Sequence, residues 1–444
     1  VDVPALARTR LDSDVATSIA YGRDVVASVT GVAADPQLSW PPGGFTNIRS
    51  LDDLAASGAR RVVLQTAALP PTQSLNYTPN AGAPLESRSG SITALLYDET
   101  LAHIVASADR TTLAAASKPA PLPTSSAGTD GNTATPSPTS DASPTASPTT
   151  ARLLEQRFLA ETALITAEHP TQSRDVIVAP PTSWDPVPGL ATALVADTGR
   201  VPWLTSTTLD AVNADDSVAR DPLTYPDAAA NAELPRSYLA GIISIRRDLS
   251  TFRSILTPPI GPTAVSLEDA TMRAESAWWR GDLSGGLALR EQVASDLSDK
   301  LDAVSISSSQ RLITLASRRG TIPVTISNNL DQAVVIGLQL SAVSKARLLA
   351  PPTDNKTIAA GRKLTVEVKA VVNQAGLFPV KAQLLTPDGE PYGSAVTLRL
   401  RSTAYGQLAL GITAGALSAL LVAIVFRLVR RNRRRESTRA ASSG

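Results

Sequence analysis

The chain has 444 residues, with 41 Lys and Arg against 40 Asp and Glu, and its formal net charge of +1 gives no reason to expect a nucleic-acid partner. It contains no cysteine, which excludes disulfides and thiolate metal sites. Two histidines and 33 prolines are typical of an envelope protein rather than of a metalloenzyme.

Residues 1–213 alternate short apolar runs with helical stretches, a pattern typical of parallel α/β units. About four or five units fit, fewer than the eight of a closed barrel, so we expect a partial (β/α)-barrel-like domain. The first predicted helix, residues 50–59, is capped by Ser50 and stops near Gly58. The remaining predicted helices are 100–108, 151–170 and 189–199, and the predicted strands are 23–32, 60–66, 91–99, 174–181 and 201–207.

A segment rich in Pro, Ser and Thr, about 118–150, interrupts this domain. Its few large apolar residues cannot offset the entropy of ordering it, so we expect a disordered insertion. O-glycosylation is an alternative use of the same composition.

Residues 233–305 change to a helical period, and we expect three amphipathic helices, at 234–256, 266–281 and 286–304. Residues 311–402 alternate with a period of two and contain frequent turn signals, which predicts an immunoglobulin-like β-sandwich. The fold class expected from the sequence is therefore multidomain, α/β plus all-β.

The C-terminal region predicts a membrane anchor. Residues 408–426 carry no charge and would span about 30 Å of hydrocarbon as a helix, and an arginine-rich tail follows at 427–444. By the positive-inside rule the tail is cytoplasmic and the N-terminal bulk extracytoplasmic, at the cell membrane. Gly411 and Gly415 have the spacing of a helix-pairing motif.

Export requires a signal, yet residues 1–10 contain neither an apolar segment nor an initiator Met. We therefore expect the sequence to be a C-terminal fragment, or Val1 to be a mis-assigned start inside a longer protein.

Candidate ligand-binding residues follow the predicted strands, where barrel-like folds place their sites. Trp184 and Asp185 combine an indole ring with a carboxylate, which suits carbohydrate, and Trp40 and Trp203 would add to the same rim. The alternative is that these tryptophans pack in the core.

Further carboxylates are candidates. Asp98 and Glu99 end a predicted strand, where two neighbouring carboxylates could serve as acid and base for sugar chemistry. Adjacent side chains on a strand point to opposite faces, so one of the two is expected to cap the next helix, and Asp98 either contacts a ligand or is that cap. Glu161 either faces the barrel mouth or pairs with Arg157, four residues earlier on the same helix. One of the adjacent Trp278 and Trp279 is expected on the buried face of its helix, and the other is expected to dock on the barrel-like domain or on a partner.

No catalytic residue, metal site or cofactor is expected. His103 and His169 lack the spacing of metal ligands, and no nucleophile elbow, P-loop or dinucleotide-binding glycine pattern is present.

Several motifs are distinctive in combination with the sandwich, the apolar span and the basic tail: LSWPPGG, LAASGARRVVL, ITALLYDE, FLAETALI and VIVAPPTSWDP. With them the chain resembles an uncharacterised family of actinobacterial membrane-anchored envelope proteins, often encoded beside the lipid II flippase. The resemblance implies a link to peptidoglycan assembly and no defined activity.

We expect a single-pass envelope protein that binds cell-wall glycan or scaffolds an envelope-assembly membrane protein. The alternative is a polysaccharide hydrolase or deacetylase whose other catalytic residues lie upstream of Val1.

Overall fold

The computed structural model divides the chain into two compact units. Unit 1 comprises Val1–Ile242 and Met272–Leu287, and unit 2 comprises Ile243–Thr271 and Ala288–Gly444. The structure describes residues 1–9, 11–110, 148–307, 312–342, 347–373, 375–403 and 406–439. Within these ranges, the side chains of 148, 149, 406–411 and 429–439 are not described. Most of the predicted disordered insertion, residues 118–147, lies outside them.

Unit 1 contains a four-stranded sheet in the order β1-β2-β4-β3. The first two pairings, β1 with β2 and β2 with β4, are parallel, and β3 is antiparallel to β4. The sheet is therefore mixed, and it forms a partial, barrel-like layer instead of the purely parallel one expected. The strands are β1 (Leu38–Ser39), β2 (Arg61–Gln65), β3 (Gly82–Ser87) and β4 (Gly90–Tyr97).

Helix α3 (Ile48–Ala56) packs on one face of this sheet, where Leu51 joins Leu64 and other buried strand residues in one apolar cluster. Burying a leucine of this kind contributes about 1.5–3 kcal/mol. The predicted N-cap, Ser50, is wrong, because the Asn47 side chain accepts a hydrogen bond from the Ser50 amide at 2.9 Å and is itself the N-cap. Gly58 follows the helix with a φ of +101°, as its predicted role as a stop requires.

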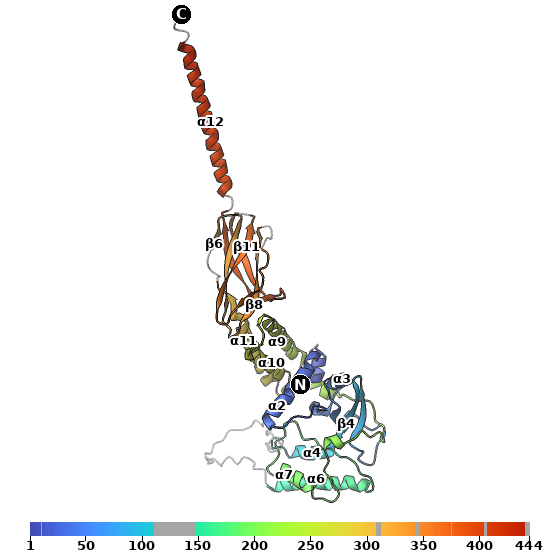
Figure 1. Ribbon diagram of the computed structural model, residues 1–444. Helices are drawn as coiled ribbons and strands as arrows, with labels where there is room; N and C mark the ends of the chain where they lie inside the picture. The colour runs from blue at the N-terminus through green and yellow to red at the C-terminus, as the bar shows by residue number, and fades with distance from the viewer. Residues whose placement is uncertain are drawn as a thin grey trace, which may run out of the picture. The chain divides into compact units, whose positions relative to one another are not determined.

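Two further helices cover another part of unit 1. Helices α4 (Glu99–Ser107) and α6 (Pro148–Glu168) lie side by side (Figure 1). Leu101 and Ile104 of α4 share a buried cluster with Phe158 of α6. The other helical segments of unit 1 that begin and end within it are α1 (Val3–Ala7), α2 (Asp12–Thr30), η1 (Pro42–Gly44), η2 (Thr66–Ala68), α7 (Leu190–Thr198), η3 (Leu209–Ala211), α8 (Asp227–Asn231) and η4 (Ala277–Arg280).

Three predicted strands are corrected. Residues 23–30 belong to α2, because Val25, Val26 and Val29 also fit a helical period and Gly31 ends the helix in the left-handed conformation. Residues 174–181 make only a single parallel bridge, Ile177 to Tyr97, and residues 201–207 contain no strand. Fewer parallel units are therefore present than the sequence pattern predicts.

The helical region is α9 (Arg236–Ile255), α10 (Pro262–Ala274) and α11 (Leu283–Asp302), and its residues are shared between the two units. The predicted helix at 266–281 ends early, at Ala274. Ser276 then adopts an extended conformation and its hydroxyl caps η4, so Trp278 and Trp279 lie in a short 3-10 turn and not on the helix.

Unit 2 contains a β-sandwich, as the alternating pattern predicts. One sheet has the order β10-β8-β12-β13-β6 and the other β5-β7-β11-β9. Inward-facing residues of both sheets, such as Val324 and Leu338, form one core with apolar residues of α9 and α11. The strands are β5 (Val304–Ile306), β6 (Leu312–Leu315), β7 (Arg319–Asn328), β8 (Val334–Ala342), β9 (Leu348–Leu349), β10 (Lys356–Ile358), β11 (Lys363–Val372), β12 (Gly376–Leu385) and β13 (Pro391–Ser402).

The predicted membrane span, residues 408–426, falls in helix α12 (Gly406–Arg439), whose described side chains are those of 412–428. Within the described residues, none of the helices has both the length and the apolarity required to cross a membrane. The span therefore stays a prediction. Gly411 and most of the basic tail fall among the residues whose side chains or placement are not described.

Candidate functional site

A cavity of about 600 Å³ opens at the carboxyl ends of the parallel strands of unit 1. We call it the strand-end cavity. This edge of a parallel sheet is where α/β proteins place their ligands. Trp40 directly follows β1, Gln65 is the last residue of β2, and Tyr97 is the last residue of β4. Glu99 and His103 of α4 complete the polar lining, and residues 179–182 form a further wall.

The loop after β1 contacts the side chain of Tyr97. The Tyr97 hydroxyl donates a hydrogen bond to the carbonyl oxygen of Gly43 in this loop at 3.3 Å. Gly44 has a φ of +71°, and a Cβ there would lie 2.7 Å from the Tyr97 hydroxyl oxygen and 2.8 Å from the amide nitrogen of Gln65. Only glycine allows both this conformation and this approach, so the WPPGG sequence determines how the cavity is closed.

The polar groups of the strand-end cavity are suited to hydrogen bonding. Burial raises the pKa of Tyr97, and a side-chain hydrogen bond with Gln65 opposes part of that rise, so the phenol stays neutral. Glu99 accepts a hydrogen bond from the Ala67 amide at 2.9 Å with Oε1. Because His103 lies four residues after Glu99 on α4, both exposed side chains occupy the same helix face.

A second cavity, of about 1040 Å³, shares Trp40 and residues 180–182 with the first. We call it the tryptophan cavity, because Trp184 and Trp278 also line it. The two cavities together are termed the groove. Trp40 is 48% exposed and Trp278 is 57% exposed, so both present ring surface to solvent.

The indoles of Trp184 and Trp279 are held by hydrogen bonds to the protein. Trp184 is partly buried, and its Nε1 donates to the Val105 carbonyl oxygen at 3.1 Å, which fixes its ring at the edge of the core. Trp279 donates to the Arg273 carbonyl oxygen at 2.8 Å, and a Cβ added to Gly286 would lie 3.0 Å from its side chain. Of the adjacent pair, Trp279 is thus packed, and Trp278 is the one available to a ligand.

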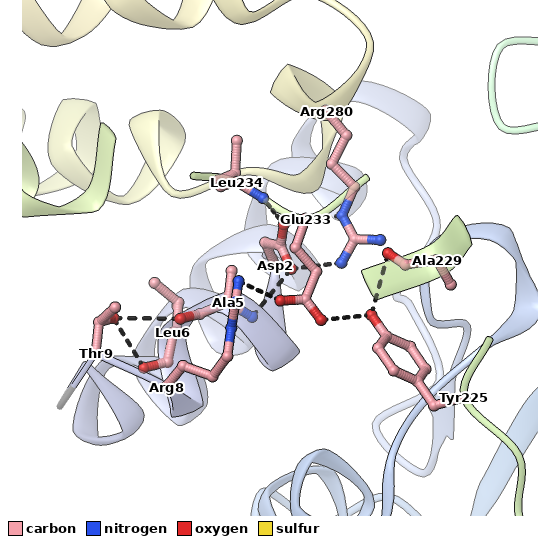
Figure 2. Close-up of polar contacts among 10 residues, drawn as sticks. All are labelled: Asp2, Ala5, Leu6, Arg8, Thr9, Tyr225, Ala229, Glu233, Leu234 and Arg280. Atoms are coloured by element: carbon pink, nitrogen blue, oxygen red, sulfur yellow. Dashed lines mark hydrogen bonds and ion pairs between the residues drawn. The ribbon is translucent and has the colours of Figure 1, made fainter. Parts of the chain in front are cut away.

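Arg280 lines the tryptophan cavity and is held by a network of ionic and polar contacts (Figure 2). The fully buried Asp2 accepts hydrogen bonds from Arg280 Nε at 2.8 Å and from the Leu234 amide at 2.9 Å. Burial lowers the pKa of Arg280, but the hydrogen bond and the charge of Asp2 raise it by more, so the net effect is an increase in the pKa. Because Asp2 neutralises it, Arg280 adds no net charge to the groove.

The same network contains a second acid. Glu233 forms an ion pair with Arg8 and accepts a hydrogen bond from the Tyr225 hydroxyl at 2.7 Å (Figure 2). Burial, followed by this hydrogen bond, raises the pKa of Tyr225. These contacts join the first residues of the chain to the segments around Tyr225 and Arg280.

The structure does not bring all of the predicted site residues together at one site. It brings Trp40 and Trp184 together in the tryptophan cavity. Asp185 does not line either cavity, because its carboxylate forms a bidentate ion pair with Arg110, at 2.7 and 2.9 Å. Asp98 is the N-cap of α4, accepting from the Leu101 amide at 2.8 Å, which confirms the capping alternative. It also lines a separate cavity of about 130 Å³.

Glu161 is half-buried on α6 and lines neither cavity of the groove. For Gly415, the space around an added Cβ is empty within 4 Å. Gln65 and His103 were not predicted as site residues, whereas Glu99 was considered as a strand-end carboxylate beside Asp98. The spacing of Glu99 and His103 on one helix face directly after a strand was the signal that could have found His103.

Among the described residues, no group of three or more His, Asp or Glu side chains is positioned to hold a metal ion.

Residues 5–441 match the model of a family described as a family of unknown function, DUF6049. The chain belongs to this family. No curated protein matches the chain in sequence.

Solved structures are only distantly similar. The α-amylase AmyC from Thermotoga maritima is 14% identical, with a TM-score of 0.39 over 65% of this chain and 63% of the amylase. WR4, an MSP family member from C. elegans, is 9% identical, with a TM-score of 0.18, and covers 23% of this chain and 98% of its own. The E. coli chaperone DraB is 14% identical, with a TM-score of 0.18, over 23% and 55% of the two chains. Likenesses this weak carry no functional information.

Proposed function

We propose that this member of the DUF6049 family is a membrane-anchored, extracytoplasmic binding protein that holds a glycan in the groove of unit 1. The observation that carries the proposal is the convergence of Trp40, Trp184 and Trp278 on one groove. These tryptophans come from three segments far apart in the sequence.

Their chemistry supports a sugar ligand. The faces of sugar rings rich in C–H groups pack on indole rings, and sugar hydroxyls need donors and acceptors around them. Beside the indoles, Gln65, Glu99 and His103 supply such groups in the strand-end cavity. A volume of about 600 Å³ lies within the usual range for small-molecule sites.

An added peptide strand is a poorer fit to the groove. A peptide that extends a sheet needs a long free strand edge. The edge strand that leads to Trp40 is β1, which is only 2 residues long. The groove therefore offers side chains rather than backbone groups to a ligand.

The alternative, a polysaccharide hydrolase or deacetylase, has less support. Glycoside hydrolysis usually uses two facing carboxyl groups. Among the described residues lining the strand-end cavity, Glu99 is the one carboxylate, and its Oε1 already accepts the Ala67 amide hydrogen bond. This arrangement favours binding over hydrolysis.

The proposed anchor is α12. Its large apolar side chains at Leu417, Val422 and Phe426 are 64%, 66% and 72% exposed, and arginines follow in the sequence. An apolar helix exposed on every side is typical of a helix that lies in lipid, with the basic residues on the cytoplasmic side. In this proposal the immunoglobulin-like sandwich is a stalk, and the partners are cell-wall glycan or an envelope-assembly membrane protein, in the actinobacterial setting beside the lipid II flippase.

The test is binding of the full chain to purified cell wall. We expect Trp40→Ala to weaken binding by up to about tenfold, because contacts of an aromatic ring face are worth about 0.5–1.5 kcal/mol. The matched control is Trp203→Ala, since Trp203 is 38% exposed, lines another cavity and donates to Thr162 Oγ1 at 3.1 Å. Equal binding by wild type and Trp40→Ala would reject the proposal.

A further inference from the structure

We propose, building on the glycan-binding function above, that the ligand is an uncharged linear oligosaccharide whose successive sugars occupy both cavities, with Trp40 between two subsites. The strand-end cavity would bind one part of the glycan and the tryptophan cavity the next. The geometry and the charge of the groove support this assignment in three steps.

The strand-end cavity and the tryptophan cavity share a wall. Trp40 and residues 180–182 line both cavities, so the two spaces adjoin on the two sides of the same residues. At about 600 and 1040 Å³, each of them is large enough for a small-molecule ligand of its own. A single sugar would leave much of this space empty, whereas a linear chain passing Trp40 fills both.

The second step is the different chemistry of the two subsites. The strand-end cavity presents hydrogen-bonding groups of Gln65, Glu99 and His103. The tryptophan cavity adds the exposed ring of Trp278, and the ring of Trp184 is held at its edge by the bond to Val105. We therefore assign orientation of the glycan to the first subsite and ring stacking along its length to the second.

The charged side chains that line the groove favour an uncharged ligand. Glu99 lines the strand-end cavity and Asp282 lines the tryptophan cavity. Hydrogen bonds from the Gly285 amide and the Ser284 hydroxyl lower the pKa of Asp282, so it is ionised at neutral pH. Asp2 already compensates Arg280, the cation in the same cavity. An anionic polysaccharide would meet the carboxylates of Glu99 and Asp282, and the Arg280 cation in the groove is already paired with Asp2, whereas an uncharged polysaccharide would not be repelled.

The experiment measures affinity against chain length. The full chain is titrated with β-1,4-linked N-acetylglucosamine oligomers, from the dimer to the hexamer, and with uronic-acid oligomers of the same lengths. We expect the hexamer of the uncharged series to bind about tenfold more tightly than its dimer, because it gains the stacking surface of the second subsite.

Variants separate the subsites. Trp278→Ala should reduce the ratio of hexamer to dimer affinity to about one, and Trp278→Phe should restore most of it by returning an aromatic face. Thermal unfolding of each variant checks that it is folded, and the phenylalanine variant keeps the test informative if the alanine variant is not.

The outcomes distinguish the two proposals. If the dimer and hexamer bind wild type equally, the two-subsite inference is wrong and the glycan-binding function stands. If the uronic-acid series binds more tightly, the assignment to uncharged glycans is overturned. If neither series binds and a proline-rich peptide does, both proposals fail.

Discussion

The Tyr97 hydroxyl donates a hydrogen bond to the carbonyl oxygen of Gly43 at 3.3 Å, which joins the end of β4 to the loop that follows β1. These two strands are not neighbours, because β2 lies between them in the sheet. The contact therefore spans the edge of the sheet and holds Trp40 beside the strand ends. Substitutions in this loop should affect both stability and ligand binding.

The clearest such substitution is Gly44→Ala. The added Cβ would lie 2.7 Å from the Tyr97 hydroxyl oxygen, at a φ of +71°, so we expect a loss of about 2–4 kcal/mol in the free energy of unfolding and weaker glycan binding. Gly43→Ala is the matched control, since its φ is +65° but nothing lies within 4 Å of the added atom, and it should cost only about 1–2 kcal/mol. Urea denaturation measures both, and equal losses would show that the close approach to Tyr97 does not matter.

The buried pair of Arg280 and Asp2 gives a second prediction. Their side chains are 12% and 0% exposed, so Arg280→Met leaves a buried carboxylate without its cation and should cost about 3–5 kcal/mol. Arg200→Met is the control, because the Arg200 side chain is 76% exposed beside Asp197 and its loss should cost no more than about 1 kcal/mol. Denaturant unfolding compares them. Similar small losses in both would mean that the network of Figure 2 does not stabilise unit 1.

The raised pKa of Tyr225 predicts that the free energy of unfolding falls at alkaline pH. Burial and the hydrogen bond to Glu233 raise its pKa in the folded protein. Above about pH 10 an unfolded tyrosine loses its proton while the folded one keeps it, so the unfolded state binds fewer protons and stability falls as pH rises. The fall from this residue is at most about 1.4 kcal/mol per pH unit and continues until the folded pKa is passed. Unfolding free energies between pH 8 and 11 should decline less steeply for Tyr225→Phe than for wild type. Parallel declines would contradict the prediction.

Periodicity predicted most of the regular structure because it reports which face of an element is buried. The sandwich and the helices α4, α6 and α7 follow from it directly. It failed at α2, where Val25, Val26 and Val29 have high β-propensity but lie on a helix with partly or fully exposed side chains. A propensity argument assumes burial that this segment does not have.

The site was predictable only to the level of the strand ends. Trp40 and Trp184 follow β1 and the Ile177 bridge, so their meeting at one edge follows from parallel order. Which of the adjacent Asp98 and Glu99 would cap α4 depended on backbone angles that the sequence does not specify. Trp278 joins them from a turn in a distant part of the chain. The sequence predicted that one of the adjacent tryptophans docks on the barrel-like domain or on a partner, but not which of the two, nor that the helix ends before them.

The anchor gives the last prediction. Leu417 lies near the middle of the predicted span, and an arginine at the centre of a membrane helix costs about 2.5–3.5 kcal/mol of insertion free energy. We therefore expect Leu417→Arg to move a large share of the protein out of the alkali-washed membrane fraction. Leu349→Arg is matched in chemistry and exposure, since Leu349 and Leu417 are both 64% exposed, but Leu349 belongs to the sandwich and its substitution should leave fractionation unchanged. Because both variants add the same charge, a difference between them reports on the surroundings of α12. Wild-type protein in the soluble fraction, or equal behaviour of the two variants, would remove the membrane anchor from the proposed function and leave the groove to be tested by itself.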